Sequence, residues 1–529
     1  MKKYVLSLCL FFLSIGCYAQ NTGESVEKWG RFEKVLKGTR SGNPFSEISL
    51  TAEFSNGTQT IKANGFYDGD GVYKIRFMPV ETGTWKYVTT SNSKELNNIK
   101  GEFICVNPGK DNHGMVKVWN TYNFKYTDGK IYYPFGTTMY AWTHQGEKLQ
   151  EETLFALKTS GFNKLRMCVF PKYYTNVEND PELYPYQKLS QKKDSTGRVT
   201  FSWNFKKFDP AFFAHLEKQL DELRDMGIEA DLIIFHPYDK GRWGFDDMGK
   251  ENDEFYLKYL VARLASFRNV WWSMANEFDY IKTKPREIWD NYSKVVSDND
   301  PYKHLLSIHN GSIYFDNSKP FITHLSIQNS SAVEDFGRAG LLRDAFFKPV
   351  IYDEVCYEGN LTQRWGRLSG QEMVHAVWQG VIAGTYVTHG ETIKGVGDTI
   401  SWAKGGKFKG ESPARIAFLR NLIEQGPGPL TLADNWKDLQ TAQVDSNYYM
   451  IYFGKEVLTE WKFSLPKKNG PPKGTKFKID VIDTWNMTVT PLTDSIVTAA
   501  ADGYRIFDKD LKVINLPGRP FIALRIKRL

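Results

Sequence analysis

Two glutamates, Glu277 and Glu354, each close an apolar segment of the sequence. Breaking a glycosidic bond requires two carboxyl groups across that bond, one of which protonates the leaving oxygen. In a retaining mechanism the other carboxylate attacks the anomeric carbon, and the two groups lie about 5–5.5 Å apart. We therefore interpret Glu277 as a candidate general acid/base and Glu354 as a candidate nucleophile.

The residues around Glu277 suit a carboxyl group that holds its proton. Trp271, Trp272 and Phe278 are close in the sequence, and an apolar wall raises a carboxyl pKa because it disfavours the charged form. A glutamate at a strand end is often only solvated, so either glutamate alone carries little information. Asn-Glu occurs once in the chain, at 276–277, and a second glutamate closes a later strand, which together favour the catalytic interpretation.

Several other side chains at the ends of predicted strands could bind a sugar through hydroxyl contacts or ring stacking. These candidates are Asn276, Arg166, His236, Trp142, His309, Gln328, His389, Glu391 and Trp402. For each tryptophan and histidine, a place in the core is an equally good interpretation. No histidine pair has zinc spacing and no Gly-x-Ser-x-Gly motif occurs, so we expect neither a metal nor another cofactor.

The elements that must position these residues alternate between strands and amphipathic helices across residues 111–428. The expected strands are 133–140, 163–170, 230–236, 270–277, 305–309, 322–327, 350–355 and 384–389, and the clearest helices are 208–226, 255–267, 285–296 and 372–383. Eight such strands predict an α/β fold, a (β/α)8 barrel, in which catalytic residues lie at the carboxyl ends of strands. A doubly wound open sheet is the alternative, but no glycine-rich phosphate loop follows the first strand.

Short strands with turns between them flank the barrel on both sides. Residues 24–110 and 429–529 are rich in β-branched and aromatic residues punctuated by glycine and proline. We expect a β-sandwich at each end of the chain, and the sequence thus predicts three domains.

The combination of motifs resembles glycoside hydrolase clan A, in which Asn-Glu ends the fourth barrel strand and the nucleophile ends the seventh. The segments 66–71 (Phe-Tyr-Asp-Gly-Asp-Gly) and 83–87 (Gly-Thr-Trp-Lys-Tyr) resemble the N-terminal β-sandwich module of a bacterial group within it. The resemblance implies that Asn276 binds the substrate's 2-hydroxyl. It also implies that Arg166 keeps Glu354 ionised and that His236 lines the sugar subsite.

Two strand ends depart from the clan pattern. The sixth often ends in His-x-Tyr, whereas this chain continues through His324 to Gln328. The eighth often ends in Trp, whereas here it gives His389-Gly390-Glu391, and Trp402 could enter from the following loop. These changes suggest an uncommon sugar or linkage.

The N-terminus predicts export. Lys2 and Lys3 precede an apolar run at 4–15 and a small-residue cleavage site at Ala19, which predicts a signal peptide over residues 1–19. A lipid anchor at Cys17 is the less favoured alternative. We expect a periplasmic or cell-surface protein of a gram-negative bacterium. No other apolar run could span a membrane, and a net charge of +7 without a long basic tract argues against nucleic acid as a partner.

The sequence therefore predicts a retaining glycoside hydrolase that acts on a polysaccharide or oligosaccharide. A carbohydrate-binding protein that kept the fold and lost turnover is one alternative, although both glutamates are present. A transglycosylase is another, because it uses the same residues and differs only in the acceptor.

Overall fold

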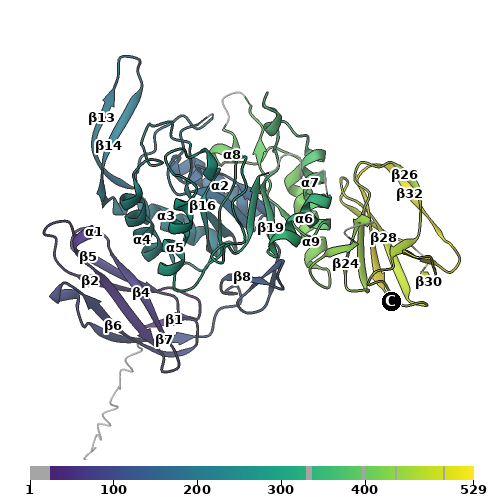
Figure 1. Cartoon of the computed structure of the whole chain (residues 1–529), viewed down its shortest axis with the longest axis horizontal. Coiled ribbons are helices and arrows are strands. Elements are labelled where there is room, and N and C mark those ends of the chain that lie inside the picture. Colours follow the sequence, from purple (N-terminus) through teal and green to yellow (C-terminus); the bar gives the residue numbers. More distant parts are fainter. Residues whose placement is uncertain (1–23, 175, 329–335, 396–398, 435–437, 493–494) are drawn as a thin grey trace, which may run out of the picture.

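The computed structural model describes residues 24–174, 176–328, 336–395, 399–434, 438–492 and 495–529. Three units follow one another along the molecule: an N-terminal sheet domain, a central barrel and a C-terminal sheet domain (Figure 1). The predicted signal peptide and Cys17 lie outside the described residues. No described helix is both long enough and apolar enough to cross a membrane.

The N-terminal unit is a strand-rich sandwich around an aromatic core. Its strands are β1 (Ser25–Glu27), β2 (Phe32–Lys37), β3 (Leu50–Ser55), β4 (Thr60–Tyr67), β5 (Val72–Phe77), β6 (Gly83–Ser91) and β7 (Lys100–Val106), in the order β1-β7-β6-β3-β4-β5-β2. Phe32 stacks on Phe103 at 4.2 Å and Phe54 on Phe77 at 4.1 Å. Such ring pairs bury large apolar areas and hold the two layers together.

Buried charges fix this unit against the barrel. Arg76 of β5 and Arg263 of helix α4 (Lys250–Leu264) share the carboxylate of Glu217, with N···O distances of 2.8 and 2.6 Å. Arg263 also contacts Asp68 at 2.7 Å, in the turn between β4 and β5. Because these side chains are largely buried, each needs its partners, and the contacts specify one docking geometry.

Eight parallel strands form the central barrel, which confirms the predicted fold. They are β11 (Gly136–Thr138), β12 (Lys164–Cys168), β15 (Glu229–Phe235), β16 (Val270–Ala275), β17 (Leu306–Ser307), β18 (Leu325–Gln328), β19 (Val350–Glu354) and β21 (Tyr386–Val387). The first five and the last three pair as separate sheets. Bridges from His309 to Ser326 and from Thr137 to His389 join the sheets and close the barrel.

Helices surround the strands (Figure 1). Besides α4 they are α2 (Glu147–Ser160), α3 (Pro210–Asp225), α5 (Ile288–Asn299), α6 (Phe336–Phe346), α7 (Gly370–Ile382), α8 (Ser401–Lys404) and α9 (Ser412–Glu424). Asp209 caps α3 by accepting the N–H of Ala211, and Pro210 occupies its first turn, which explains where the predicted helix begins. Helix α4 begins at Lys250, five residues before the predicted start.

Four ionised side chains fill the interior of the barrel. Lys164 lies 2.6 Å from Asp231 and 2.8 Å from Asp353, and Arg166 lies 3.3 Å from Asp231. Burial alone would raise the pKa of Asp353, but Lys164 and Arg166 hold it well below its usual range. Asp353 precedes Glu354 and belongs to this network, so the network forms the floor beneath the carboxyl ends of the strands.

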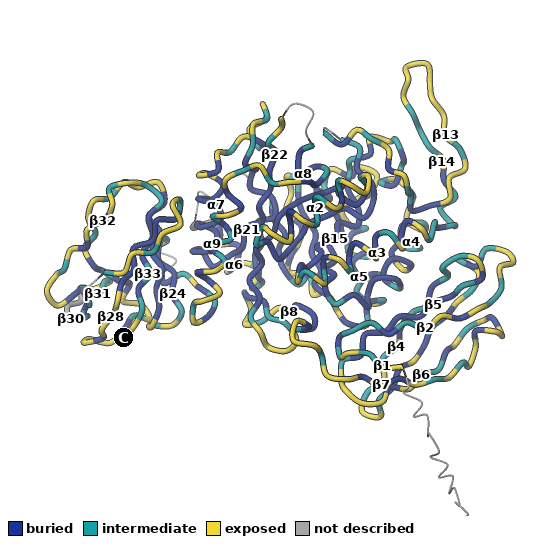
Figure 2. Tube along the Cα trace, turned by 180° about the vertical axis from the view of Figure 1, so that it is seen from behind, coloured by how far each residue is buried: buried dark blue, intermediate teal, exposed yellow. Residues whose placement is uncertain are grey.

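Two smaller β structures are attached to the barrel. The sheet of β8 (Val116–Trp119), β9 (Asn123–Tyr126) and β10 (Ile131–Tyr132) packs on its N-terminal end, where Phe124 lies 5.5 Å from Trp271. The hairpin of β13 (Tyr186–Lys193) and β14 (Val199–Phe208) projects beyond the body of the molecule, and its tip is exposed (Figures 1 and 2).

The C-terminal unit is a second strand-rich domain that packs on α7. Its strands are β23 (Thr431–Asp434), β24 (Asp438–Val444), β25 (Tyr448–Tyr452), β26 (Leu458–Lys462), β27 (Ser464–Pro466), β28 (Lys476–Asp483), β29 (Thr488–Pro491), β30 (Ile496–Ala501), β31 (Arg505–Asp508), β32 (Val513–Arg519) and β33 (Ile522–Arg528). His375 of α7 lies 2.9 Å from the Tyr452 hydroxyl, and Trp378 packs on the same ring. These contacts attach the domain to the barrel.

Candidate active site

A cavity of 790 Å³ opens at the carboxyl ends of the barrel strands. Glu277, after β16, and Glu354, at the end of β19, both line it. The structure therefore brings together the two glutamates that the sequence singled out. Aromatic side chains dominate the rest of the wall: Tyr140, Tyr174, Tyr238, Tyr280, Tyr314, Tyr357, Trp365 and Trp402.

Glu277 reaches the cavity by a turn of the backbone. Strand β16 ends at Ala275, and Glu277 has φ 49° and ψ 54°, in the left-handed region that a non-glycine residue rarely adopts. The N–H of Asn276 donates to the carbonyl of Phe235, and that of Phe278 donates to His309, so both neighbours are fixed. The predicted strand included Glu277, but this turn and not strand alternation sets the direction of its carboxyl. Backbone strain of this kind persists where the surroundings impose it, often at functional sites.

The Glu277 carboxyl is suited to carry a proton at neutral pH. Burial raises its pKa to about 8, and the negative charge of Glu354 acts in the same direction. Hydrogen bonding from Gln328 and the charge of Lys172 oppose this rise. A general acid needs this property, because it must hold its proton until the leaving oxygen accepts it.

Glu354 has different partners. The hydroxyl of Tyr140, at the end of the first barrel strand, donates a short hydrogen bond to its Oε1, and His309 Nε2 lies 3.9 Å from the same atom. Burial is the largest effect and raises the pKa of Glu354, whereas the Tyr140 hydrogen bond and the charges of Arg166 and Lys172 offset part of that rise. These groups stabilise the ionised carboxylate, the form that a nucleophile requires.

Arg166 was expected to keep Glu354 ionised, and its charge does lower the pKa of that carboxyl, but its hydrogen bonds go to other residues. Its guanidinium donates to Asn276 Oδ1 at 2.8 Å, to Ser273 at 3.2 Å and to Asp231 at 3.3 Å. Asn276 in turn donates from Nδ2 to the Tyr238 hydroxyl at 3.2 Å. Arg166 therefore orients Asn276, because the guanidinium donates a hydrogen bond to the amide oxygen.

The two histidines nearest the site are buried beneath it. His236 Nε2 lies 3.1 Å from the Phe170 carbonyl, and its Nδ1 accepts the N–H of Tyr238. Burial lowers its pKa to about 3, so it stays neutral and supports Tyr238, which lines the cavity in its place. His309 donates or accepts through Nδ1 with Ser326 at 2.9 Å.

Asn276, Arg166, His236 and His309 do not line the cavity, and neither do three other expected sugar contacts. Trp142 is fully buried and donates to Met167 Sδ at 3.4 Å, so it belongs to the core. His389 lies 2.9 Å from Thr137 Oγ1 and stacks on Phe162 at 4.9 Å. Strand β21 is short, and His389, two residues after its end, bridges to Thr137 of the first barrel strand.

Glu391, the third, binds backbone donors near the start of α9. Its carboxylate accepts the N–H of Lys409 at 2.8 Å and of Gly410 at 2.7 Å, while Glu358 accepts those of Glu411 and Ser412 at 2.7 and 3.1 Å. Glu358, Glu391 and His389 come within 4.8 Å of one another. Because both carboxylates already bind N–H groups, this cluster anchors the helix start, where negative charge is stabilising.

Gln328 and Trp402 do line the cavity, and the structure adds residues that sequence reasoning missed. Lys172 lies there with its ammonium 4.0 Å from the ring centre of Tyr140 and 4.4 Å from that of Trp402. Tyr140 stands at the end of a predicted strand, a signal that could have identified it. Nothing in the sequence distinguishes Lys172 from the other lysines of the long insertion after the second strand.

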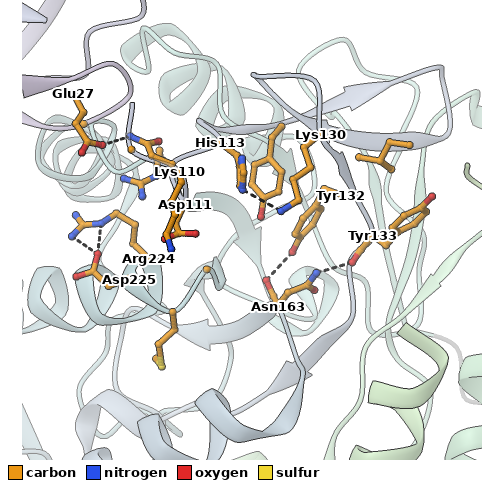
Figure 3. A pocket seen from close by; sticks show the side chains of 18 of the residues that line it. Glu27, Lys110, Asp111, His113, Lys130, Tyr132, Tyr133, Asn163, Arg224 and Asp225 are labelled. Carbon is orange, nitrogen blue, oxygen red and sulfur yellow. Dashed lines mark hydrogen bonds and ion pairs between the residues drawn. The ribbon is translucent and has the colours of Figure 1, made fainter. Parts of the chain in front are cut away.

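A second cavity lies at the opposite end of the barrel. It measures 1310 Å³ and is bounded by the N-terminal domain, the segment 109–113 and the N-terminal ends of barrel strands (Figure 3). Arg224 contacts Asp225 at 2.7 Å, His113 contacts Asp128 at 2.7 Å, and Asn163 bonds to the Tyr133 carbonyl at 2.8 Å. Some of its charged groups thus form ion pairs or hydrogen bonds with neighbouring side chains.

Comparison with known proteins places the chain among glycoside hydrolases. The family model of the apiosidase-like catalytic domain matches residues 119–426, and two models of domains of unknown function match 25–92 and 436–527. A provisionally assigned glycoside hydrolase from Bacteroides vulgatus, solved as a crystal structure, is 50% identical. That match covers 96% of this chain and 100% of the other, with a TM-score of 0.94.

A second solved structure, a glycoside hydrolase family 5 protein from Bacteroides vulgatus, is 12% identical and covers 78% of this chain and 93% of its own, with a TM-score of 0.56. At that identity the likeness shows the fold alone. No curated protein matches the chain. The comparisons confirm the resemblance to glycoside hydrolase clan A.

Proposed function

This chain belongs to the family of the apiosidase-like catalytic domain, and we propose that it hydrolyses glycosidic bonds with retention of configuration. One observation carries the proposal: two buried glutamates from different strands line one cavity, where burial raises both pKa values. Glu354 alone accepts the hydroxyl of Tyr140 and has its pKa lowered by the charge of Arg166, which suits it to the role of nucleophile and Glu277 to that of acid.

In the first step, Glu277 donates its proton to the glycosidic oxygen while Glu354 attacks the anomeric carbon. The bond to the leaving oxygen breaks, and a covalent ester forms between the sugar and Glu354. Tyr140 then loses a negatively charged acceptor as Glu354 becomes an ester, and its hydroxyl is free to turn toward the sugar.

In the second step, the ionised Glu277 takes a proton from water, and the oxygen of that water attacks the anomeric carbon. The ester breaks, the sugar leaves with its original configuration, and both glutamates return to their starting states. Asn276 is buried beside Glu277, and its amide bonds to Arg166 and to Tyr238, which lines the cavity. Aromatic faces along the wall suit the C–H faces of sugar rings.

The test is product release from a glycan panel that includes apiosides, because the matched family is described by that activity. Wild type should cut at least one glycan, and Glu354→Gln and Glu277→Gln should both spare it. Glu251→Gln is a matched control, since that side chain is 88% exposed on α4. A variant of either site glutamate that cuts as fast as wild type contradicts the assignment.

The same experiment separates the alternative functions. Tight binding of a glycan that wild type leaves uncut would indicate a carbohydrate-binding protein. Products longer than the substrate would indicate transfer to a sugar acceptor in place of water.

We also propose that the protein is secreted to the periplasm or cell surface, on the strength of the predicted signal peptide at 1–19. N-terminal sequencing of the exported protein should begin at Gln20. A mature chain that begins at a lipidated Cys17 would support the lipid anchor in its place.

A further inference from the structure

One cation stands beside the two glutamates in an aromatic enclosure. Lys172 follows β12 by four residues and lines the cavity with Glu277 and Glu354. Its Nζ lies 4.0 Å from the ring centre of Tyr140, 4.3 Å from that of Tyr238 and 4.4 Å from that of Trp402. The residue is 2% exposed, so this ammonium has lost most of its contact with bulk water.

No described residue forms an ion pair with this ammonium, although the charges of Glu354 and Glu277 help it to keep its proton. Among the described residues, none forms an ion pair or a hydrogen bond with Lys172, so its three N–H donors have no partner there. The cation–ring contacts offset part of the cost of this desolvation. Burial nevertheless lowers the pKa of Lys172 to about 8, so the group is still mostly charged at neutral pH. A buried charge without partners is costly, and a ligand that supplies an acceptor would stabilise it.

The charges around the cavity are unbalanced in the same sense. Apart from Arg364, which has an interaction of its own, its charged lining residues are Lys172 and Lys240 against Glu277 and Glu354. Glu277 keeps its proton at neutral pH, because burial raises its pKa. The cations thus outnumber the ionised carboxylates, and a negatively charged ligand would be favoured over a neutral one.

The position of Lys172 indicates which part of a ligand it would meet. Its nearest ring belongs to Tyr140, whose hydroxyl donates to Glu354. The ammonium therefore lies on the side of the cavity where Glu354 would attack, and there it faces the sugar that becomes bonded to the enzyme.

We infer that Lys172 recognises an anionic substituent, a carboxylate or a sulfate ester, on the sugar that binds beside Glu354. The inference rests on the proposed function for the orientation of that sugar. It makes Lys172 a specificity-determining residue, which separates acidic sugars from their neutral counterparts by pairing with the negative group.

The test is calorimetric titration of free sugars, which requires no bond cleavage. The probes are glucuronate with glucose, galacturonate with galactose, and galactose 6-sulfate with galactose. At least one acidic sugar should bind wild type roughly tenfold or more tightly than its neutral partner, because one charge-assisted hydrogen bond is worth about that much. The uronate and sulfate arms show which anionic group is recognised.

Lys172→Met should lose this preference, and Lys125→Met should keep it. Lys125 is a matched control because its ammonium also lies over a ring, 5.5 Å from Trp119, at the other end of the barrel. Thermal unfolding checks that both variants fold. If Lys172→Met does not fold, the wild-type ratios decide the question.

Equal binding of both partners in every pair, including binding of neither, overturns the inference, as does a preference that survives Lys172→Met. If wild type shows no acidic preference but hydrolyses a glycan in a Glu354-dependent way, this inference alone is overturned. An acidic preference in a protein that cleaves no glycan overturns the proposed function and leaves the recognition by Lys172 standing.

Discussion

The two ends of the barrel each carry a cavity, and they differ in how their charges are arranged. The cavity at the N-terminal end is the larger, 1310 Å³ against 790 Å³, and charged side chains are numerous there. Some of them form ion pairs, as Arg224 does with Asp225 and Arg420 with Glu424. At the carboxyl end, Glu277 lies close enough to Glu354 for repulsion. Volume is therefore a poor guide to function in this molecule, and unneutralised charge is a better one.

The barrel itself explains the difference. Its interior network of Lys164, Arg166, Asp231 and Asp353 is buried and internally paired, so it forms a rigid floor between the two ends. Above this floor, Glu277 and Glu354 are buried and have too few opposite charges nearby to offset the cost of burial. Their pKa values therefore rise. Perturbed pKa values of this origin gather at functional sites.

Replacing Glu354 should have the largest effect. Glu354→Gln keeps the shape but removes the attacking oxygen's charge, so kcat should fall by at least about 10³-fold. Rapid-quench or steady-state assays on the substrate that the panel identifies would measure this. A fall in kcat of less than tenfold would contradict the assignment of function to the cavity at the carboxyl end, because that cavity would then hold no essential nucleophile.

Glu277 should govern the alkaline limb of the pH profile. Its protonated form is the active acid, so kcat/KM should fall as pH rises through its pKa, about 8. Glu277→Gln should lower kcat/KM by about 10²–10⁴-fold and remove this limb. Substrates with good leaving groups should be less affected, because they need no protonation. An unchanged alkaline limb in the variant would assign the titration to another group.

Much of the fold could be predicted because its signals are local. Eight apolar segments with intervening amphipathic helices sufficed for the barrel, and all eight strands exist, although β17 and β21 span only two residues each. Glu277 and Glu354 were found because both follow such segments. The left-handed turn at Glu277 could not be read from the sequence, because a few hydrogen bonds from neighbouring strands impose it.

The errors concern residues whose partners lie far away in the sequence. His389 and Glu391 lie at or just after the end of a predicted strand, as Glu354 does. Yet His389 bonds to Thr137, and Glu391 accepts the backbone N–H groups of Lys409 and Gly410. Lys172 was missed for the converse reason, because its importance depends on rings contributed by three other loops. Strand ends predict where a side chain begins but not which group it meets.

Removal of one hydroxyl at the carboxyl end should have a moderate effect. Tyr140→Phe leaves the ring against Lys172 and deletes the hydrogen bond to Glu354. A hydrogen bond to a charged group contributes about 1.5–3 kcal/mol, so kcat/KM should fall roughly tenfold to a hundredfold. Because the bond lowers the pKa of Glu354, the acid limb should also move to higher pH. An unchanged acid limb would show that this hydroxyl does not stabilise the carboxylate.

The smallest effect on activity is expected from a substitution in the cavity at the N-terminal end of the barrel. This substitution is also the most direct test of the comparison between the two cavities. Arg224 contacts Asp221 and Asp225, and its side chain is 21% exposed. Partly exposed ion pairs contribute about 0–1 kcal/mol, so Arg224→Met should lower the free energy of unfolding by no more than that. Hydrolysis should stay within about twofold of wild type, since variation of this size is expected from surface substitutions. Urea unfolding and kcat/KM measure the two quantities in one preparation. A tenfold loss of activity with unchanged stability would mean that the larger cavity takes part in function. A cavity with paired charges could then not be taken as functionally unimportant.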